Sequence, residues 1–134
     1  MSSNPILIID DDTTILDMIA DLLSYEGYTI TTTNKGSVAL DHALAEPPAL
    51  ILLDLMMPEM SGWQVVAALS GSQRTRSIPV ILLSARRDLA TTAAELGATA
   101  FLEKPFELDA LLDLIKQYVQ LDNSTNPQED STAN

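Results

Sequence analysis

Residues 50–58 constrain the fold of this chain more than any other stretch. Four consecutive apolar residues end in the carboxylate of Asp54, and three further apolar residues separate this carboxylate from Pro58. An uninterrupted apolar run is typical of a strand that is buried on both faces, as in a parallel sheet covered by helices. Asp54 would then lie at the carboxyl end of the strand, where open α/β sheets bind ligands, although aspartate also begins many turns.

The rest of the chain alternates between strand and helix patterns. Strands are predicted at residues 6–9, 28–32, 50–53, 79–83 and 99–102, and helices at residues 15–26, 37–45, 63–69, 86–96 and 107–119. This alternation predicts an α/β fold: a doubly wound five-stranded parallel sheet with five helices on its two faces. In the flavodoxin-like strand order 2-1-3-4-5, the first and third strands are neighbours.

Length and composition indicate one globular domain at residues 1–120, followed by a disordered polar tail at residues 121–134. The net charge of −12 argues against binding to nucleic acid or to an anionic membrane surface. No segment reaches the roughly 18 apolar residues of a membrane span, and the sequence has no cysteine and no recognisable signal peptide. We therefore expect a cytoplasmic protein.

Four of the five predicted strands end in a residue that can take part in chemistry. Asp10 and Asp11 follow the first strand, Asp54 the third, Ser84 the fourth and Lys104 the fifth. Because the carboxyl ends of parallel strands meet at one edge of a sheet, we expect these five side chains to lie together. Taken alone, the acidic residues after the first strand could simply cap a helix, and the lysine could be a solvated charge.

This set of side chains indicates phosphoryl transfer. Three close carboxylates cannot all stay ionised without a cation, and oxygen ligands favour Mg²⁺, with Mn²⁺ as the alternative. Lys104 suits a phosphate oxygen, and Ser84 supplies a hydroxyl donor. Transfer of a phosphoryl group to a carboxylate needs mainly positioning and charge neutralisation, so Asp54 is predicted to be the nucleophile.

The sequence resembles the receiver domains of response regulators in two-component signalling. The resemblance lies in residues 6–12, residues 54–58 with Gly62, residues 80–85 and residues 97–106. It implies that Asp54 is the phosphoacceptor of a phosphorelay, and that a histidine kinase or phosphotransfer protein supplies the phosphoryl group. It also implies a protein that catalyses its own phosphorylation and dephosphorylation and is not a turnover enzyme.

The resemblance implies roles for individual residues as well. The ligands that it implies for Mg²⁺ are Asp10, Asp11, Asp54 and the backbone carbonyl of Met56. Lys104 would contact the phosphoryl group, and its bond to Pro105 would be cis. Ser84 would be the switch hydroxyl and Phe101 the switch aromatic residue.

A few positions depart from the family pattern. Ser61 and Gln64 stand where Asp and Glu are usual, and Phe101 stands where Tyr is commoner. The segment between Ser84 and Gly97 looks slightly shorter than usual, and the family transmits its signal through this segment. We therefore expect the phosphorylation chemistry to be retained and the output geometry to differ.

A second apolar line on the last predicted helix is a candidate partner surface, formed by Ala110, Leu114 and Tyr118. Together with the last strand and the preceding helix, it belongs to the face that receiver domains commonly use for partners. We expect a protein as the downstream partner, or a homodimer that depends on phosphorylation.

Three other functions compete with that of a receiver domain. In a haloacid-dehalogenase-like phosphatase, Asp10 would be the nucleophile and Asp12 the acid/base, but Asp54 comes too early for the acidic pair which that family needs. A pseudo-receiver would bind a partner without phosphorylation, although such a module normally lacks one of the key groups. In a flavodoxin, three carboxylates after the first strand would repel the phosphate of FMN.

Overall fold

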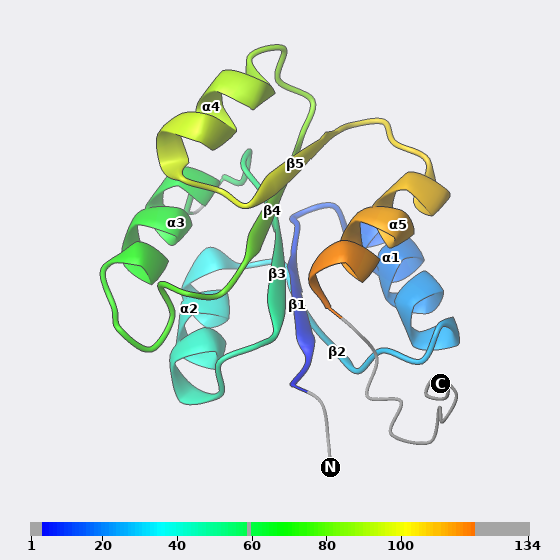
Figure 1. The fold of residues 1–134 in the computed structure, drawn as a ribbon, viewed down its shortest axis with the longest axis horizontal. Helices are drawn as coiled ribbons and strands as arrows, with labels where there is room; N and C mark the ends of the chain where they lie inside the picture. Colours follow the sequence, from blue (N-terminus) through cyan, green and yellow to red (C-terminus); the bar gives the residue numbers. More distant parts are fainter. Residues whose placement is uncertain (1–3, 59, 120–134) are drawn as a thin grey trace, which may run out of the picture.

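The computed structural model describes residues 4–58 and 60–119, which form a doubly wound α/β fold (Figure 1). Within these residues, five parallel strands lie in the order β2-β1-β3-β4-β5, as predicted. The strands are β1 (Ile6–Ile9), β2 (Ile30–Thr33), β3 (Leu50–Asp54), β4 (Val80–Ser84) and β5 (Ala100–Glu103). The helices are α1 (Thr13–Tyr25), α2 (Gly36–Ala45), α3 (Gly62–Ser70), α4 (Leu89–Leu96) and α5 (Leu108–Tyr118).

Helices α2, α3 and α4 cover one face of the sheet, and α1 and α5 cover the other (Figure 1). Successive side chains of a strand point to opposite faces, so β1 contributes to two cores. Leu7 and Ile9 pack in the core beneath α2, α3 and α4, whereas Ile6 and Ile8 pack in the core beneath α1 and α5. Every residue of β1, β3 and β4 is buried, which explains their uninterrupted apolar runs.

The strand register brings the carboxyl ends of the central strands to one edge of the sheet. Ile9 at the end of β1 pairs with Leu53, and Asp54 at the end of β3 pairs with Leu83. The residues that follow β1 and β3 are therefore neighbours in space, although more than forty residues of chain separate Asp10 from Asp54.

Helix α1 begins at Thr13, earlier than the start predicted at residue 15. The reason is the side chain of Asp12, whose Oδ1 accepts hydrogen bonds from the N–H groups of Thr14 at 3.0 Å and Ile15 at 3.3 Å. This N-cap satisfies donors of the first turn that would otherwise lack partners.

Helix α4 begins at Leu89, later than the start predicted at residue 86. The N–H of Arg86 donates to Ser84 Oγ at 3.2 Å, and the guanidinium of Arg86 pairs with the carboxylate of Asp88 at 2.8 Å. These contacts hold the residues after β4 in a loop, so the helical pattern of the sequence starts before the helix does.

None of the described helices is long and apolar enough to cross a membrane. The polar tail predicted at residues 121–134 lies outside the described residues, so its disorder stays a prediction, as does the cytoplasmic location.

Candidate functional site

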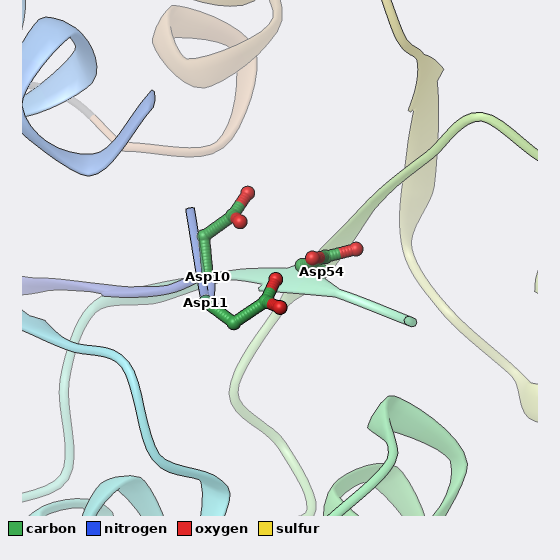
Figure 2. Close-up of side chains that lie close together, drawn as sticks. All are labelled: Asp10, Asp11 and Asp54. Atoms are coloured by element: carbon green, nitrogen blue, oxygen red, sulfur yellow. The ribbon is translucent and has the colours of Figure 1, made fainter. Parts of the chain in front are cut away.

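Three aspartates meet at the carboxyl edge of the sheet, as Figure 2 shows. Asp10 and Asp11 follow β1, Asp54 ends β3, and one carboxylate oxygen from each lies within 4.8 Å of the other two. Asp10 and Asp54 are buried, with 0% and 3% of their surface exposed, whereas Asp11 is exposed. The structure thus brings together the three carboxylates that the sequence singles out.

Hydrogen bonds from the backbone orient the two buried carboxylates. Asp10 Oδ1 accepts a hydrogen bond of 2.9 Å from the N–H of Asp12, and Asp54 Oδ1 accepts one of 3.0 Å from the N–H of Met56. In both cases the donor lies two residues after the acceptor, so the chain turns as soon as the strand ends. These turns leave the Oδ2 atom of each aspartate available to other partners.

Lys104 places a positive charge beside the two buried aspartates. Its Nζ lies 2.8 Å from Asp10 Oδ2 and 3.6 Å from Asp54 Oδ2. Its backbone N–H donates to the carbonyl oxygen of Ser84 at 2.9 Å, which ties the end of β5 to the end of β4. The bond between Lys104 and Pro105 is cis, as the resemblance implies.

Ser84 and Phe101, the two switch residues of the resemblance, lie in different surroundings. Ser84 ends β4 at the same sheet edge as the aspartates and is buried, and its Oγ accepts the hydrogen bond from Arg86. Phe101 lies within β5 and is 39% exposed. The structure therefore places the hydroxyl at the site and the aromatic ring on the neighbouring surface.

The electrostatic balance of the site favours an added positive charge. The pKa of the Asp54 carboxyl is raised to about 7, first by burial and then by the charge of Asp10, while the Met56 N–H and the Lys104 ammonium oppose the shift. Burial lowers the pKa of Lys104, but its hydrogen bond to Asp10 and the charges of both aspartates outweigh burial and leave that pKa raised. One ammonium therefore does not neutralise the three carboxylates.

This donor set fits a small divalent cation. Mg²⁺ prefers carboxylate and carbonyl oxygens and keeps several waters, which suits a cluster with two buried aspartates and one exposed one. The residues that could hold the ion are Asp10, Asp11 and Asp54, and the raised pKa of Asp54 reflects the negative charge that the ion would offset.

Comparison with known families decides what this chain is. The family described as the response regulator receiver domain matches residues 6–116, a range that includes all the strands of the sheet and most of α5. The chain belongs to this family. The receiver fold and the two-component signalling function predicted from the sequence are thereby confirmed.

The receiver domain has curated relatives and solved structural neighbours. It is 36% identical to the uncharacterized transcriptional regulatory protein YkoG of Bacillus subtilis, over 98% of this chain and 58% of that protein. The chain spans about half the length of the curated relatives that it matches. The chemotaxis protein CheY4 of Vibrio cholerae superimposes with a TM-score of 0.81 and 27% identity, over 88% of this chain and 100% of that one.

A further neighbour shares the fold. The receiver domain of the sensor histidine kinase PA1611 from Pseudomonas aeruginosa superimposes with a TM-score of 0.79 and 23% identity, over 87% of this chain and 98% of that one. That structure has a magnesium ion coordinated in its active site cleft.

The phosphatase-like alternative is not favoured. Besides the family membership, the carboxylate of Asp12 caps helix α1 through the N–H groups of Thr14 and Ile15. The residue that would serve as the acid/base of such a phosphatase therefore has a structural role in this receiver domain.

The two unusual residues before and within α3 form a capping box. Ser61 Oγ accepts a hydrogen bond of 3.3 Å from the N–H of Gln64, and Gln64 Oε1 accepts one of 3.0 Å from the N–H of Ser61. The departures from the family pattern at these positions thus stabilise the start of α3.

The predicted partner surface is only partly exposed. Ala110 and Tyr118 are exposed on α5, but Leu114 is half-buried and packs against the core beneath α1 and α5. The partner surface of Ala110, Leu114 and Tyr118 stays a prediction, and of the three only Leu114 is partly covered by the core. It lies one turn from Leu111 in the core stripe of α5, so it borders the buried face.

Sequence reasoning missed one group of residues beside the site. The guanidinium of Arg86 lies over the ring of Trp63, 5.1 Å from its centroid. The only signal in the sequence is an arginine two residues after Ser84. Periodicity cannot find the partner ring, because Trp63 lies on α3 and Arg86 lies in the loop after β4.

Gly62→Ala is expected to destabilise the receiver domain by about 1–3 kcal/mol through overpacking. A Cβ at Gly62 would lie 2.6 Å from Leu55 Cα and 3.0 Å from the carbonyl oxygen of Asp54, and the Gly62 N–H is held by the Leu55 carbonyl at 2.9 Å. Urea unfolding measures the loss. Gly71→Ala is the matched control, since its Cβ would meet nothing closer than 3.5 Å; equal losses in both variants would contradict the packing argument.

Proposed function

We propose that Asp54 accepts a phosphoryl group from the phosphohistidine of a histidine kinase or phosphotransfer protein. The observation that carries this proposal is the buried carboxylate of Asp54 at the end of β3, grouped with Asp10 and Asp11 and 3.6 Å from the ammonium of Lys104. Membership of the receiver domain family supports it.

In the proposed step, an oxygen of Asp54 forms a bond to phosphorus while the P–N bond of the donor histidine breaks, and the histidine nitrogen keeps the electron pair. Such a step needs positioning and charge neutralisation more than acid–base chemistry. Lys104 Nζ neutralises phosphoryl oxygens, and Ser84 Oγ donates a hydrogen bond to one of them. The chain thus catalyses its own phosphorylation and, with water as acceptor, its dephosphorylation.

We assign Mg²⁺, or Mn²⁺ in its place, to the carboxylates of Asp10, Asp11 and Asp54 with the backbone carbonyl of Met56. When bound, the cation offsets the charge of the phosphoryl oxygens. The clustered carboxylate oxygens support this assignment, as does the magnesium ion in the PA1611 receiver domain, which shares the fold.

Incubation with acetyl phosphate and Mg²⁺ followed by measurement of the intact mass tests this function. We expect a mass increase of one phosphoryl group, which chelation of the cation prevents. If no adduct forms under conditions that label an active receiver domain, the pseudo-receiver becomes the better description.

The upstream partner in this proposal is a histidine kinase or phosphotransfer protein. Downstream, the curated relatives include transcriptional regulatory proteins, and this chain spans about half of their length. DNA is therefore a candidate target in proteins of that kind, and the prediction that nucleic acid plays no part is too broad. The net charge of −12 argues only against DNA binding by the surface of this chain itself.

The division of the chain into a receiver domain at residues 1–120 and a polar segment at residues 121–134 is also part of the proposal. The family match at residues 6–116 falls inside the proposed domain. Tyr28 Oη donates to the carbonyl oxygen of Val119 at 3.4 Å, which supports a domain boundary after this residue.

We infer that the partner surface is formed by α5, β5 and α4, with Tyr118, Phe101 and Ala110 as its exposed apolar residues. Tyr118→Ala is expected to weaken association of the beryllofluoride-loaded protein by about tenfold, as loss of an interface tyrosine commonly does. Sedimentation measures the association.

Tyr25→Ala is the matched control, because Tyr25 is 89% exposed and lies at the end of α1, which is not part of the proposed partner surface. It should associate like the wild type. Equal behaviour of the two variants would place the partner surface elsewhere, and loss of phosphorylation in Tyr118→Ala would mean that this side chain supports the fold.

A further inference from the structure

Arg86 makes three contacts that join the phosphorylation site to helix α4. Its N–H donates to Ser84 Oγ at 3.2 Å, its guanidinium donates to both carboxylate oxygens of Asp88 at 2.8 Å, and the guanidinium lies 5.1 Å from the centroid of the Trp63 ring. A cation at this distance from the face of an indole is attracted by it. The loop after β4 is thus fastened to α3 on one side and to the start of α4 on the other.

The pair with Arg86 has a consequence for α4. Asp88 is the N-cap residue of α4, yet its side chain accepts no hydrogen bond from the helix. The N-caps of α1 and α3 do accept such bonds: Asp12 from two N–H groups and Ser61 from one. The Asp88 carboxylate is engaged by Arg86, and the Asp88 backbone (φ −95°, ψ 28°) is not in the extended conformation of Asp12 and Ser61, so the first N–H groups of α4 lack the cap that an aspartate can supply.

Two arrangements of the loop therefore compete for the same carboxylate. In the structure, Arg86 holds Asp88 and lies over Trp63. In the other arrangement, Asp88 would accept from the N–H of Ala90 or Thr91, as Asp12 does in α1. The Arg86–Asp88 pair is exposed and contributes little stability by itself, so a modest change at Ser84 suffices to shift the balance.

We propose that Arg86 is a latch: in the resting receiver domain its ion pair with Asp88 keeps that carboxylate from capping α4. Binding of a phosphoryl group, or of beryllofluoride, at the phosphorylation site breaks this ion pair. The release rests on the function proposed above, in which Ser84 Oγ donates to a phosphoryl oxygen. In the proposed switch, the Ser84 side chain turns towards that oxygen and its Oγ moves away from the backbone N–H of Arg86. The loop after β4 then shifts, the guanidinium leaves Trp63, and Asp88 caps α4. The latch would act beside the site, without touching the phosphoryl group.

The fluorescence of Trp63, the single tryptophan of the chain, reports on the latch. We expect the emission of the wild type to change when beryllofluoride and Mg²⁺ are added. Arg86→Ala should show the emission of the loaded state already at rest and change little on loading. Arg87→Ala removes the same charge from the adjacent exposed position and should behave like the wild type.

Amide hydrogen exchange tests the cap in the resting protein, with no ligand. In Arg86→Ala, exchange at Ala90 and Thr91 should slow by about fivefold, the factor that a helix N-cap typically contributes. The slowing should disappear in the double variant Arg86→Ala with Asp88→Ala, which has no carboxylate to form the cap. Wild-type exchange rates in Arg86→Ala would overturn the latch.

The ¹⁹F signal of bound beryllofluoride separates failure of the latch from failure of the proposed function. A bound signal with unchanged Trp63 emission in the wild type would overturn the latch and leave the phosphorylation site intact. Absence of a bound signal would count against the site itself, and the exchange rates at Ala90 and Thr91 would then decide whether the resting contact exists as described.

Discussion

Asp54→Asn is expected to abolish the phosphoryl adduct that the wild type forms with acetyl phosphate and Mg²⁺. An amide is a far weaker nucleophile than a carboxylate, and it also removes one of the clustered oxygen ligands. The substitution keeps the size of the side chain, and the amide oxygen can still accept from the Met56 N–H. We therefore expect complete loss of incorporation in a folded protein, measured by intact mass.

Two further variants distinguish Asp54 from the neighbouring carboxylates as the nucleophile. Asp17→Asn removes a carboxylate from the exposed side of α1 and should leave the adduct unchanged. Asp10→Asn should slow phosphorylation, because it removes a neighbour of the cation and the partner of Lys104, but it should leave the nucleophile in place. An adduct that survives in Asp54→Asn and disappears in Asp10→Asn would revive the phosphatase-like mechanism.

In the absence of divalent cations, the receiver domain is expected to lose stability as the pH rises from about 4 to about 7. The pKa of Asp54 is about 7 in the folded protein, against roughly 3.9 for an unfolded aspartate. Between these values the folded state keeps a proton that the unfolded state has lost, so the free energy of unfolding falls with rising pH. The total fall from this group is as much as about 4 kcal/mol.

Urea unfolding at a series of pH values, with chelator present, measures this fall. In Asp54→Asn the free energy of unfolding should not fall in this way as the pH rises. This variant should be more stable than the wild type near neutral pH, since its side chain does not ionise. Equal stability of the wild type at pH 5 and pH 8 would show that burial does not penalise the Asp54 carboxylate.

Mg²⁺ should restore the stability that the receiver domain loses as the pH rises. The cation binds ionised carboxylates, so its stabilising effect should be present at neutral pH and fade as the pH falls below about 7, where Asp54 is protonated. At 100 times its Kd the ion would add about 2.7 kcal/mol to the free energy of unfolding. Absence of any stabilisation by millimolar Mg²⁺ at neutral pH would contradict the metal assignment.

The sequence predicts the features of this receiver domain that depend on burial pattern and chain order. Uninterrupted apolar runs mark β1, β3 and β4 because both faces of these strands are covered. The residues that follow these runs must then meet at one sheet edge, which is why the sequence alone is enough to group Asp10, Asp11 and Asp54.

Individual side-chain contacts, which helical periodicity does not encode, account for what the sequence could not predict. The pattern for a helix begins at residue 86, but the hydrogen bonds of Arg86 with Ser84 and Asp88 and its contact with the Trp63 ring hold it in a loop, and α4 begins only at Leu89. Likewise, helical periodicity places Leu114 on a line with Tyr118, but only the packing of α5 against α1 and the sheet decides that one is half-buried and the other exposed.

In the resting site, the ammonium of Lys104 already serves as a counterion for the aspartates through its ion pair with Asp10. A divalent cation that binds the three aspartates would compete with an ammonium that already lies 2.8 Å from the carboxylate of Asp10. In the proposed function, cation binding would therefore be an exchange of counterions, and it would release Lys104 from Asp10 to contact the phosphoryl group. The affinity for the metal and the availability of Lys104 for phosphate would in this way be coupled through a residue that is not itself a metal ligand.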